Sequence, residues 1–240
     1  MTQTSKNLKQ AARTLRKAMA QLTFELPVTH VYQPLDYAWP MHEAYLERFG
    51  GSTKQVVMLG MNPGPWGMAQ TGVPFGEVAA VRDWMQLDAP VGQPAEEHPK
   101  RPIEGLNCSR SEVSGRRLWG LFADRFGSAQ AFFAQHFVTN YCPLVFMEEG
   151  GRNRTPDKLA PDEKAAIQQA CDAHLVRVIE ILKPTWVVGV GGFARQRAQK
   201  VLGDHPVQLA TVLHPSPASP AANRGWADAA TTQLIEQGVW

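Results

Sequence analysis

The chain of 240 residues carries a formal net charge of +2, and 44% of its residues are hydrophobic. This length fits one α/β domain with a full core, or at most two small domains. The near-balanced charge does not require a nucleic-acid partner, although it permits one where basic residues cluster. Three widely spaced cysteines argue against a disulfide framework and are one thiolate short of the usual iron–sulfur set. With no recognisable signal peptide or membrane-spanning apolar run, we expect reduced thiols in an intracellular protein.

The predicted elements alternate between helices and strands along the chain. Leu8, Leu15 and Met19 recur at helical spacing, so residues 1–26 are expected to form an amphipathic helix packed on a single domain that spans residues 1–240. Ser111 is expected to cap the helix that follows the polar, proline-rich stretch. In chain order, the predicted helices span residues 5–22, 41–49, 78–85, 111–126, 129–135, 161–182, 193–202 and 225–237. The predicted strands are short apolar runs at residues 56–59, 137–141, 186–190 and 207–213.

This alternation predicts a mostly parallel sheet with helices on both of its faces. In such sheets ligands bind beyond the carboxyl ends of the strands. Three unusual features fall at those ends: the loop 60–76, Asn140, and the segment 214–220 that begins with His214. Their convergence indicates a site more strongly than any one of them alone.

The loop 60–76 follows the first strand and contains five glycines and three prolines. Glycine removes side chains where a ligand approaches the backbone, and proline stiffens the path of the chain. Within this frame lie the amide of Asn62 and the aromatic rings of Trp66 and Phe75. The pattern suits a flat polar ligand, although a long structural turn has a similar composition.

Three side chains are candidates for chemistry, and each has a structural alternative. Asn62 could position a water molecule or a ligand edge, or bond to its own turn, as asparagine before proline often does. His214 could act as an acid, a base or an electrophile, or be a histidine satisfied by backbone groups. Asn140 offers a donor and an acceptor that can read a two-atom edge of a base, or cap a turn.

Other reaction classes fit less well. The loop 60–76 lacks the G-K-[ST] of a phosphate cradle, and no G-x-S-x-G elbow is present. The glycine turn at 189–192 is not the G-x-G-x-x-G of dinucleotide binding. Cys142 with His214 would form a thiol dyad, but a cysteine between Tyr and Pro at a strand end is more often a core residue. No Cys/His cluster offers metal ligands, and neither a metal nor a cofactor is predicted.

These residues resemble a known family, the single-strand-selective monofunctional uracil-DNA glycosylases. The segment 60–77, G-M-N-P-G-P-W-G-M-A-Q-T-G-V-P-F-G-E, is similar to the long and specific first motif of that family. H-P-S-P at 214–217, followed by N-R-G-W at 223–226, resembles the second motif and its wedge loop. Further similar stretches are V-R-D-W at 81–84, E-H-P-K-R-P at 97–102, S-E-V-S-G at 111–115, and Asn140 with C-P-L at 142–144. The match runs from about Tyr37 to the end and leaves out the N-terminal helix.

The resemblance implies a three-layer αβα sandwich with a central four-stranded, mostly parallel sheet. It also implies hydrolysis of the N-glycosidic bond of uracil, and of 5-substituted uracils such as 5-hydroxymethyluracil, in single- and double-stranded DNA, which leaves an abasic site. By the same resemblance, Asn62 orients the attacking water and His214 stabilises charge on the departing base. The implied substrate contacts are the backbone of Met61, Gly64 as space near C5, Phe75 as a stacking ring, and Asn140 as reader of the uracil edge.

The residue types agree with this chemistry. A base must leave the helical stack before an enzyme reaches its glycosidic bond, and an aromatic ring such as Phe75 can stack on it. The amide of Asn140 can pair with both O4 and N3–H of uracil, whereas cytosine reverses that pattern and would leave a buried polar group unpaired. No lysine lies in the Asn62 or His214 motifs, so a Schiff-base lyase step is not indicated.

Contact with DNA is expected from two loops. The basic loop 150–164 suits phosphate groups, and its expected contacts are Gly151, Arg152, Asn153, Arg154 and Lys158. The segment after the last strand would enter the duplex, through Pro215, Ser216, Pro217, Ala218, Ser219 and Arg224. An arginine often follows H-P-S-P in the family, whereas this chain has Ala218, so the wedge loop departs from the family pattern.

The expected partner is therefore DNA that contains uracil or oxidised uracil, bound by a monomer without a membrane or a metal. The expected location is intracellular, at the nucleoid of a bacterium or in a eukaryotic nucleus. One alternative keeps the fold but acts on deaminated purines such as hypoxanthine. Another is a DNA-binding module without turnover, against which Asn62 and His214 argue because simple binding requires neither.

Overall fold

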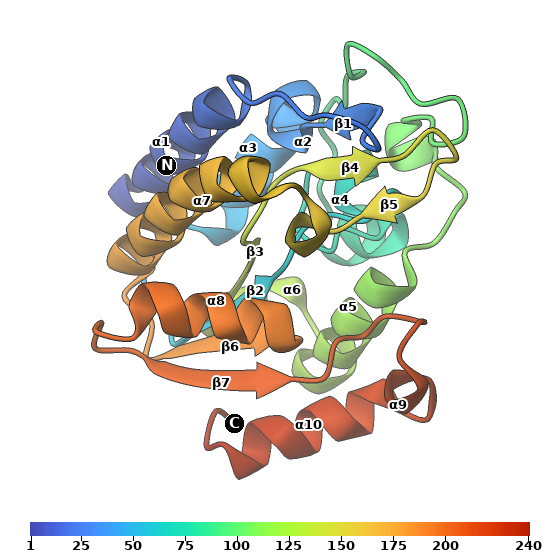
Figure 1. The fold of residues 1–240 in the computed structure, drawn as a ribbon. Helices are drawn as coiled ribbons and strands as arrows, with labels where there is room; N and C mark the ends of the chain where they lie inside the picture. Colours follow the sequence, from blue (N-terminus) through green and yellow to red (C-terminus); the bar gives the residue numbers. More distant parts are fainter.

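The computed structural model describes residues 1–240 and contains a central sheet of four parallel strands (Figure 1). Its strand order is β3-β2-β6-β7. The strands are β2 (Val56–Gly60), β3 (His136–Asn140), β6 (Trp186–Val190) and β7 (Gln208–Val212). Every residue of β2 is buried, as expected for a strand inside a parallel sheet with both faces covered. The predicted strands and the αβα architecture are therefore confirmed.

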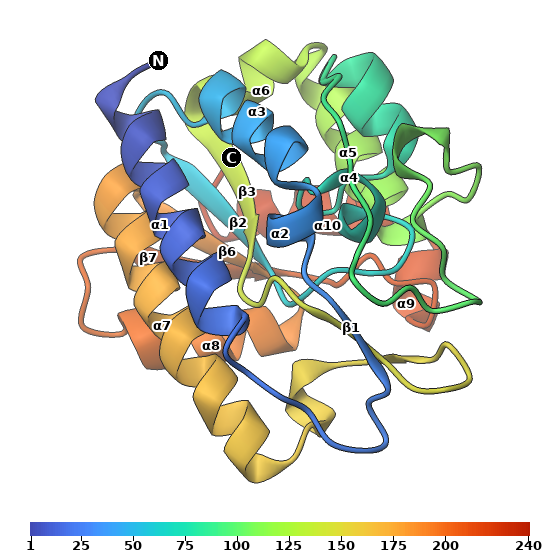
Figure 2. The ribbon, with the colours of Figure 1, turned by 90° about the horizontal axis from the view of Figure 1, so that it is seen from above.

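Helices cover both faces of this sheet. On one face, α8 (Gly192–Leu202) packs on β6 and β7, α7 (Pro161–Leu182) packs on α8, and α1 (Gln3–Met19) packs on α7. Figure 2 shows α1 and α7 side by side. The second face carries α10 (Trp226–Glu236), α5 (Val113–Phe126) and α6 (Ala129–Gln135), and α3 (Trp39–Phe49) packs on α1 and α6. None of these helices is both long and apolar enough to span a membrane.

The N-terminal helix is amphipathic, as predicted. It buries Leu8, Leu15 and Met19 along one face, and these side chains join the main hydrophobic core. The hydroxyl of Thr2 caps its first turn by accepting a hydrogen bond of 3.3 Å from the backbone of Ser5. Such a cap satisfies one of the amide groups that the first turn leaves unpaired.

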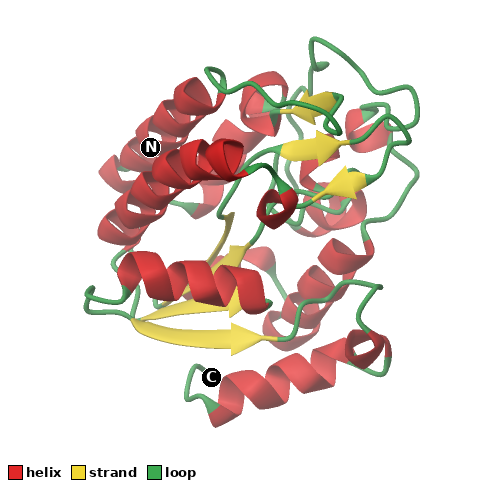
Figure 3. Cartoon of the chain, in the orientation of Figure 1, coloured by secondary structure: helices red, strands yellow, loops and turns green.

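A second, antiparallel sheet was not predicted. It has the order β1-β4-β5 and consists of β1 (His30–Tyr32), β4 (Val145–Met147) and β5 (Asn153–Arg154). Figure 3 shows these short strands apart from the central sheet. Strands of two or three residues are too short for an apolar–polar alternation to be recognised, so sequence periodicity does not reveal them. This sheet shapes the loop that was predicted to bind phosphate groups.

The remaining elements are short. They comprise α2 (Pro34–Tyr37), α4 (Met68–Thr71), a π-helical turn at Ala80–Trp84, 3₁₀ turns at Gly105–Asn107 and Pro156–Lys158, and α9 (Pro220–Asn223). The prediction that Ser111 caps α5 is wrong. Glu112 occupies the capping position without a side-chain capping bond, and the hydroxyl of Ser111 accepts a bond from Arg116. The side chain of Glu112 instead contacts Gly64 and Gly67 in the loop 60–76.

Candidate active site

A cavity of about 350 Å³ lies where the loops that follow β2, β3 and β7 meet. It contains all six residues that were predicted to act on the substrate. Its lining consists of Met61, Asn62, Pro63, Gly64, Pro65, Gly67, Met68, Phe75, Glu112, Ser114, Asn140, Asn153, Thr155, His214, Ser216 and Pro217. A larger hollow of about 670 Å³ lies between α1 and α7, shares no lining residue with this cavity, and has only two titratable side chains, His174 and Arg177, in its wall. The polar cavity is therefore the candidate active site.

Asn62 is held by the segment that follows β3. Its amide nitrogen Nδ2 donates to the carbonyl oxygen of Leu144 at 3.1 Å. A carbonyl oxygen can only accept, so this bond fixes which end of the amide is the nitrogen. The carbonyl oxygen Oδ1 of Asn62 is left free to accept a hydrogen bond from a ligand or a water molecule.

Asn140 ends β3 directly opposite Gly60, the last residue of β2. Its Nδ2 donates to the sulfur of Met68 at 3.4 Å, whereas its Oδ1 is buried and has no hydrogen-bond donor. A Cβ atom on Gly60 would overlap Oδ1 of Asn140 and lie 2.5 Å from Cε2 of Phe75. Position 60 therefore requires glycine, because the two side chains meet over its Cα atom.

Phe75 occupies a backbone conformation that is unusual for a residue with a side chain. Its φ angle is +53°, in the left-handed region that costs free energy for residues other than glycine. Its carbonyl oxygen accepts bonds from the indole of Trp119 at 2.9 Å and from the backbone of Glu77 at 2.7 Å, which hold this conformation. The ring centroid of Phe75 lies 6.5 Å from that of His214.

His214 follows β7 and packs on the glycine turn after β6. Gly191 has a φ angle of +89°, and a Cβ atom there would lie 3.0 Å from Cβ of His214. The backbone N–H of Ser216 donates to Nδ1 of His214 at 3.1 Å, so Nδ1 is an acceptor and the proton of the neutral ring is on Nε2. Burial lowers the pKa of His214 below its usual value of 6.5, which favours this neutral form.

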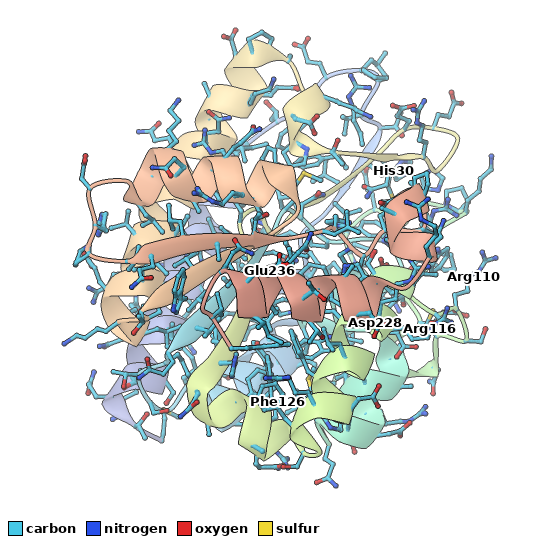
Figure 4. The ribbon with its side chains drawn as sticks, turned by 90° about the horizontal axis from the view of Figure 1, so that it is seen from below. His30, Arg110, Arg116, Phe126, Asp228 and Glu236 are labelled. Carbon is cyan, nitrogen blue, oxygen red and sulfur yellow. The ribbon has the colours of Figure 1, made fainter.

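Arg117 in α5 fastens the loop that begins with His214, and the sequence did not reveal it. Its guanidinium donates to the carbonyl oxygen of Pro215 at 3.0 Å and to Oδ1 of Asn223 at 2.8 Å. The indole of Trp226 donates to the carbonyl oxygen of Leu213 at 2.6 Å. Figure 4 shows α10, which begins at Trp226, from below and labels Arg116, the residue that precedes Arg117 in α5.

Glu112 is a second residue that sequence reasoning missed, although the S-E-V-S-G motif contains it. Its carboxylate packs on Gly64, where a Cβ atom would lie 2.5 Å from Oε2. Burial raises the pKa of Glu112 above its usual value of 4.5, while the backbone N–H of Trp66 offsets part of that effect. The cavity thus contains a carboxyl group beside the first loop.

The predicted DNA contacts in the loop 150–164 differ in exposure and in whether their side chains are already bonded. Asn153 lines the cavity, and its Oδ1 is buried without a donor. Arg152 and Lys158 are exposed, whereas Gly151 is buried. The guanidinium of Arg154 bonds to Glu148 at 3.0 Å and to a backbone carbonyl, so part of its charge is already paired.

In the second loop, Ser216 and Pro217 line the cavity, Pro215 is buried, and Ala218 is exposed. The hydroxyl of Ser219 caps α9, and Arg224 is exposed at the end of that helix. No group of three or more His, Cys, Asp or Glu side chains gathers where it could hold a metal ion.

The chain resembles known proteins over most of its length. Residues 47–235 match the uracil DNA glycosylase superfamily. The chain is 50% identical over 227 residues to the single-strand selective monofunctional uracil DNA glycosylase of Mus musculus, covering 94% of this chain and 81% of that protein. It is 48% identical to the Bos taurus protein of the same name, covering 94% and 84% of the two chains.

A solved structure shares the fold. The wild-type SMUG2 protein of Pedobacter heparinus superposes with a TM-score of 0.68 at 18% identity, covering 95% of this chain and 98% of that one. Because the superfamily match spans most of the chain and half of the residues are identical to those of named relatives, the chain belongs to the single-strand-selective monofunctional uracil-DNA glycosylase family.

Proposed function

We propose that the protein is a monofunctional DNA glycosylase that hydrolyses the N-glycosidic bond of uracil in DNA during base-excision repair. The observation that carries the proposal is the buried Oδ1 of Asn140, an acceptor without a donor inside a cavity of about 350 Å³. An unpaired buried acceptor costs about 1–3 kcal/mol. The N3–H of a flipped uracil would supply the missing donor.

The walls of the cavity support the recognition of a flat base. Phe75 offers a ring face for stacking, which is worth about 1–3 kcal/mol per base in nucleic-acid complexes. Asn140 pairs with N3–H through Oδ1 and turns Nδ2 from Met68 toward O4. Cytosine presents an acceptor at N3 and would leave Oδ1 unpaired, so the same side chain discriminates against it.

His214 assists departure of the base. As the glycosidic bond breaks, negative charge accumulates on the uracil oxygens and positive charge on the sugar. A preorganised donor directed at developing charge stabilises the transition state by roughly 3–4 kcal/mol. The Ser216 backbone bond to Nδ1 supports Nε2–H as that donor, and no proton needs to be transferred from the ring.

Asn62 holds the attacking water. Its Nδ2 is bound to Leu144, which leaves Oδ1 to accept a bond from a water molecule near C1′ of the sugar. An amide is too weak a base to remove the proton early, so bond cleavage precedes attack: water adds to the oxocarbenium sugar, and the proton that it loses balances the one gained by the departed uracil anion. No lysine lines the cavity, which supports hydrolysis without a Schiff-base intermediate.

The proposal extends to 5-substituted uracils such as 5-hydroxymethyluracil, and to single- and double-stranded DNA. The space beside Gly64 is occupied by the carboxylate of Glu112, which can accept a bond from a hydroxymethyl group. On duplex DNA, Ala218 provides no long side chain to replace the flipped base. We therefore expect Ala218→Arg to raise uracil release from duplex DNA while leaving release from single strands unchanged.

The first experiment is release of free uracil from a uracil-containing oligonucleotide. Wild type is expected to release uracil and leave an alkali-labile abasic site, whereas the Asn62→Ala, His214→Ala double variant releases almost none. Equal release by the two proteins would overturn the proposal. A parallel series with 5-hydroxymethyluracil, cytosine and hypoxanthine in the same sequence tests the substrate range.

The proposed enzyme acts as a monomer inside the cell, where its DNA substrate lies. Cys108, Cys142 and Cys171 are all free and buried, which suits a reducing compartment. Sedimentation at assay concentration tests the oligomeric state.

A further inference from the structure

Two arginines pack on the ring of Trp66, immediately outside the active-site cavity. The guanidinium carbon of Arg110 lies 4.6 Å from the ring centroid, and that of Arg101 lies 5.2 Å from it. Both are cation–π distances. We name Trp66, Arg101 and Arg110 the Trp66 cluster. Trp66 itself is the residue between Pro65 and Gly67, which both line the cavity.

Neither guanidinium of this cluster is paired with a carboxylate. Arg110 is exposed and forms no ion pair. Arg101 donates from Nη1 only to the backbone carbonyl of Lys100, at 3.0 Å, and its Nε is buried without an acceptor. Arg154, by contrast, is bound to Glu148. Nη2 of Arg101 and the whole guanidinium of Arg110 therefore keep donors available for an anion, and an arginine fork matches the geometry of a phosphate group.

The cluster also contacts the β4–β5 segment, which supplies Asn153 to the wall of the cavity. A Cβ atom on Gly151 would lie 3.3 Å from Cβ of Lys100 and 3.6 Å from Cζ of Arg101. Arg101 thus packs on the hairpin that supplies Asn153 to the cavity wall. Figure 4 shows Arg110 at the end of the molecule that carries α9. The cluster is therefore placed beside the cavity that would take the flipped nucleotide.

We propose that the Trp66 cluster is a phosphate-binding subsite for the DNA strand that carries the target nucleotide. This inference rests on the proposed function. Arg110 and Arg101 bind the phosphodiester backbone beside the flipped nucleotide, and the ring of Trp66 holds their guanidinium groups in place. The subsite is separate from the loop of His214, and it contributes affinity for the strand without touching the reacting atoms.

The test is single-turnover uracil release at increasing enzyme concentration, which separates the half-saturating concentration from the maximal rate. In a uracil-containing single strand, Arg110→Gln is expected to raise the half-saturating concentration about three- to tenfold at low salt, and to reduce the log–log salt slope by about 0.7. The maximal rate is unchanged. Trp66→Ala is expected to weaken binding further, since both guanidinium groups are released, whereas Trp66→Phe keeps a ring and most of the affinity.

A matched control exists elsewhere in the chain. Arg125 is also exposed and packs on a tryptophan, with its guanidinium carbon 4.2 Å from the Trp240 centroid, but neither residue lines the cavity. Arg125→Gln should leave affinity and salt slope at wild-type values. If Arg110→Gln behaves like Arg125→Gln, the subsite is absent. If it lowers the maximal rate alone, the cluster only braces the loop and the inference is overturned.

Shortened oligonucleotides show on which side of the uracil the phosphate bound by Arg110 lies. With oligonucleotides that end one nucleotide from the uracil on either side, the Arg110→Gln effect should disappear for one truncation and persist for the other. Persistence in both overturns the subsite. Failure of the proposed function gives a different result, namely no uracil release by wild type. In that case, the affinity of wild type and of Arg110→Gln for a uracil-free single strand, measured at several salt concentrations, still shows whether Arg110 binds a phosphate.

Discussion

The Cα atom of Gly64 lies against the carboxylate of Glu112, so closely that a Cβ atom at position 64 would be 2.5 Å from Oε2 and 2.9 Å from Oε1. Gly64 belongs to the loop after β2 and Glu112 directly precedes α5, so this contact joins two walls of the active-site cavity. Neither residue can change size without moving the other.

Gly64→Ala is therefore expected to lower kcat/KM for uracil release by about 10- to 100-fold, because overpacking of this kind costs about 1–3 kcal/mol. The loss arises from displacement of Glu112 and the first loop. Steady-state kinetics on a single-stranded uracil substrate measures it.

Gly120→Ala is the control, since Gly120 lies within α5 and a Cβ atom there meets nothing within 4 Å. It should keep full activity and gain about 0.5–1 kcal/mol of stability from its helical position. Full activity of Gly64→Ala would contradict the prediction, because it would show that Glu112 can move aside without loss of activity.

Glu112→Gln tests the buried carboxyl group through stability. Burial raises the pKa of Glu112, so the folded protein binds this proton more tightly than the unfolded chain does. The resulting stability is present below pH 4.5, the ordinary pKa, and is lost as the pH rises through the raised value. We expect Glu112→Gln to be more stable than wild type at pH 7, with the difference closing toward pH 4. Urea unfolding across this range measures it, and a gap independent of pH would contradict the assignment.

The pH dependence of uracil release tests the neutral form of His214. Its pKa is lowered by burial, and Nδ1 accepts the Ser216 N–H, so protonation would place a second donor against that N–H. We expect kcat to be constant above pH 6.5 and to fall only at more acidic pH, as the ring is protonated. The residual activity of His214→Ala should not show this fall of kcat at acidic pH. A wild-type rate that rises from pH 7 to 5.5 would identify the imidazolium as the active form.

Arg117→Ala is expected to loosen the loop of His214 without touching the base. The variant loses the bonds to Pro215 and Asn223, and each charge-assisted hydrogen bond of this kind contributes about 1.5–3 kcal/mol. Activity should fall more on duplex than on single-stranded DNA, because only the duplex requires insertion of the loop. A double-mutant cycle with Asn223→Ala should be non-additive. Additive effects would show that Arg117 acts elsewhere.

Much of the architecture was predictable because it depends on local patterns. Continuous apolar runs mark β2, β3, β6 and β7, and helical periodicity marks the elements between them. Asn62 and His214 each follow a strand and Asn140 ends one, and parallel strands bring their carboxyl ends to one edge. The sequence alone therefore predicts that these three residues lie close together.

Tertiary contacts decided the rest, because they join residues that are distant in the sequence. Arg117 reaches a carbonyl 98 positions away, and no local motif marks that bond. The orientation of Asn62 depends on Leu144, and the raised pKa of Glu112 depends on burial against Gly64. The amino-acid order thus determined which groups the strand ends carry, whereas contacts between the loops, such as Asn62 with Leu144 and His214 with Ser216, determined which atoms of those groups can donate and accept.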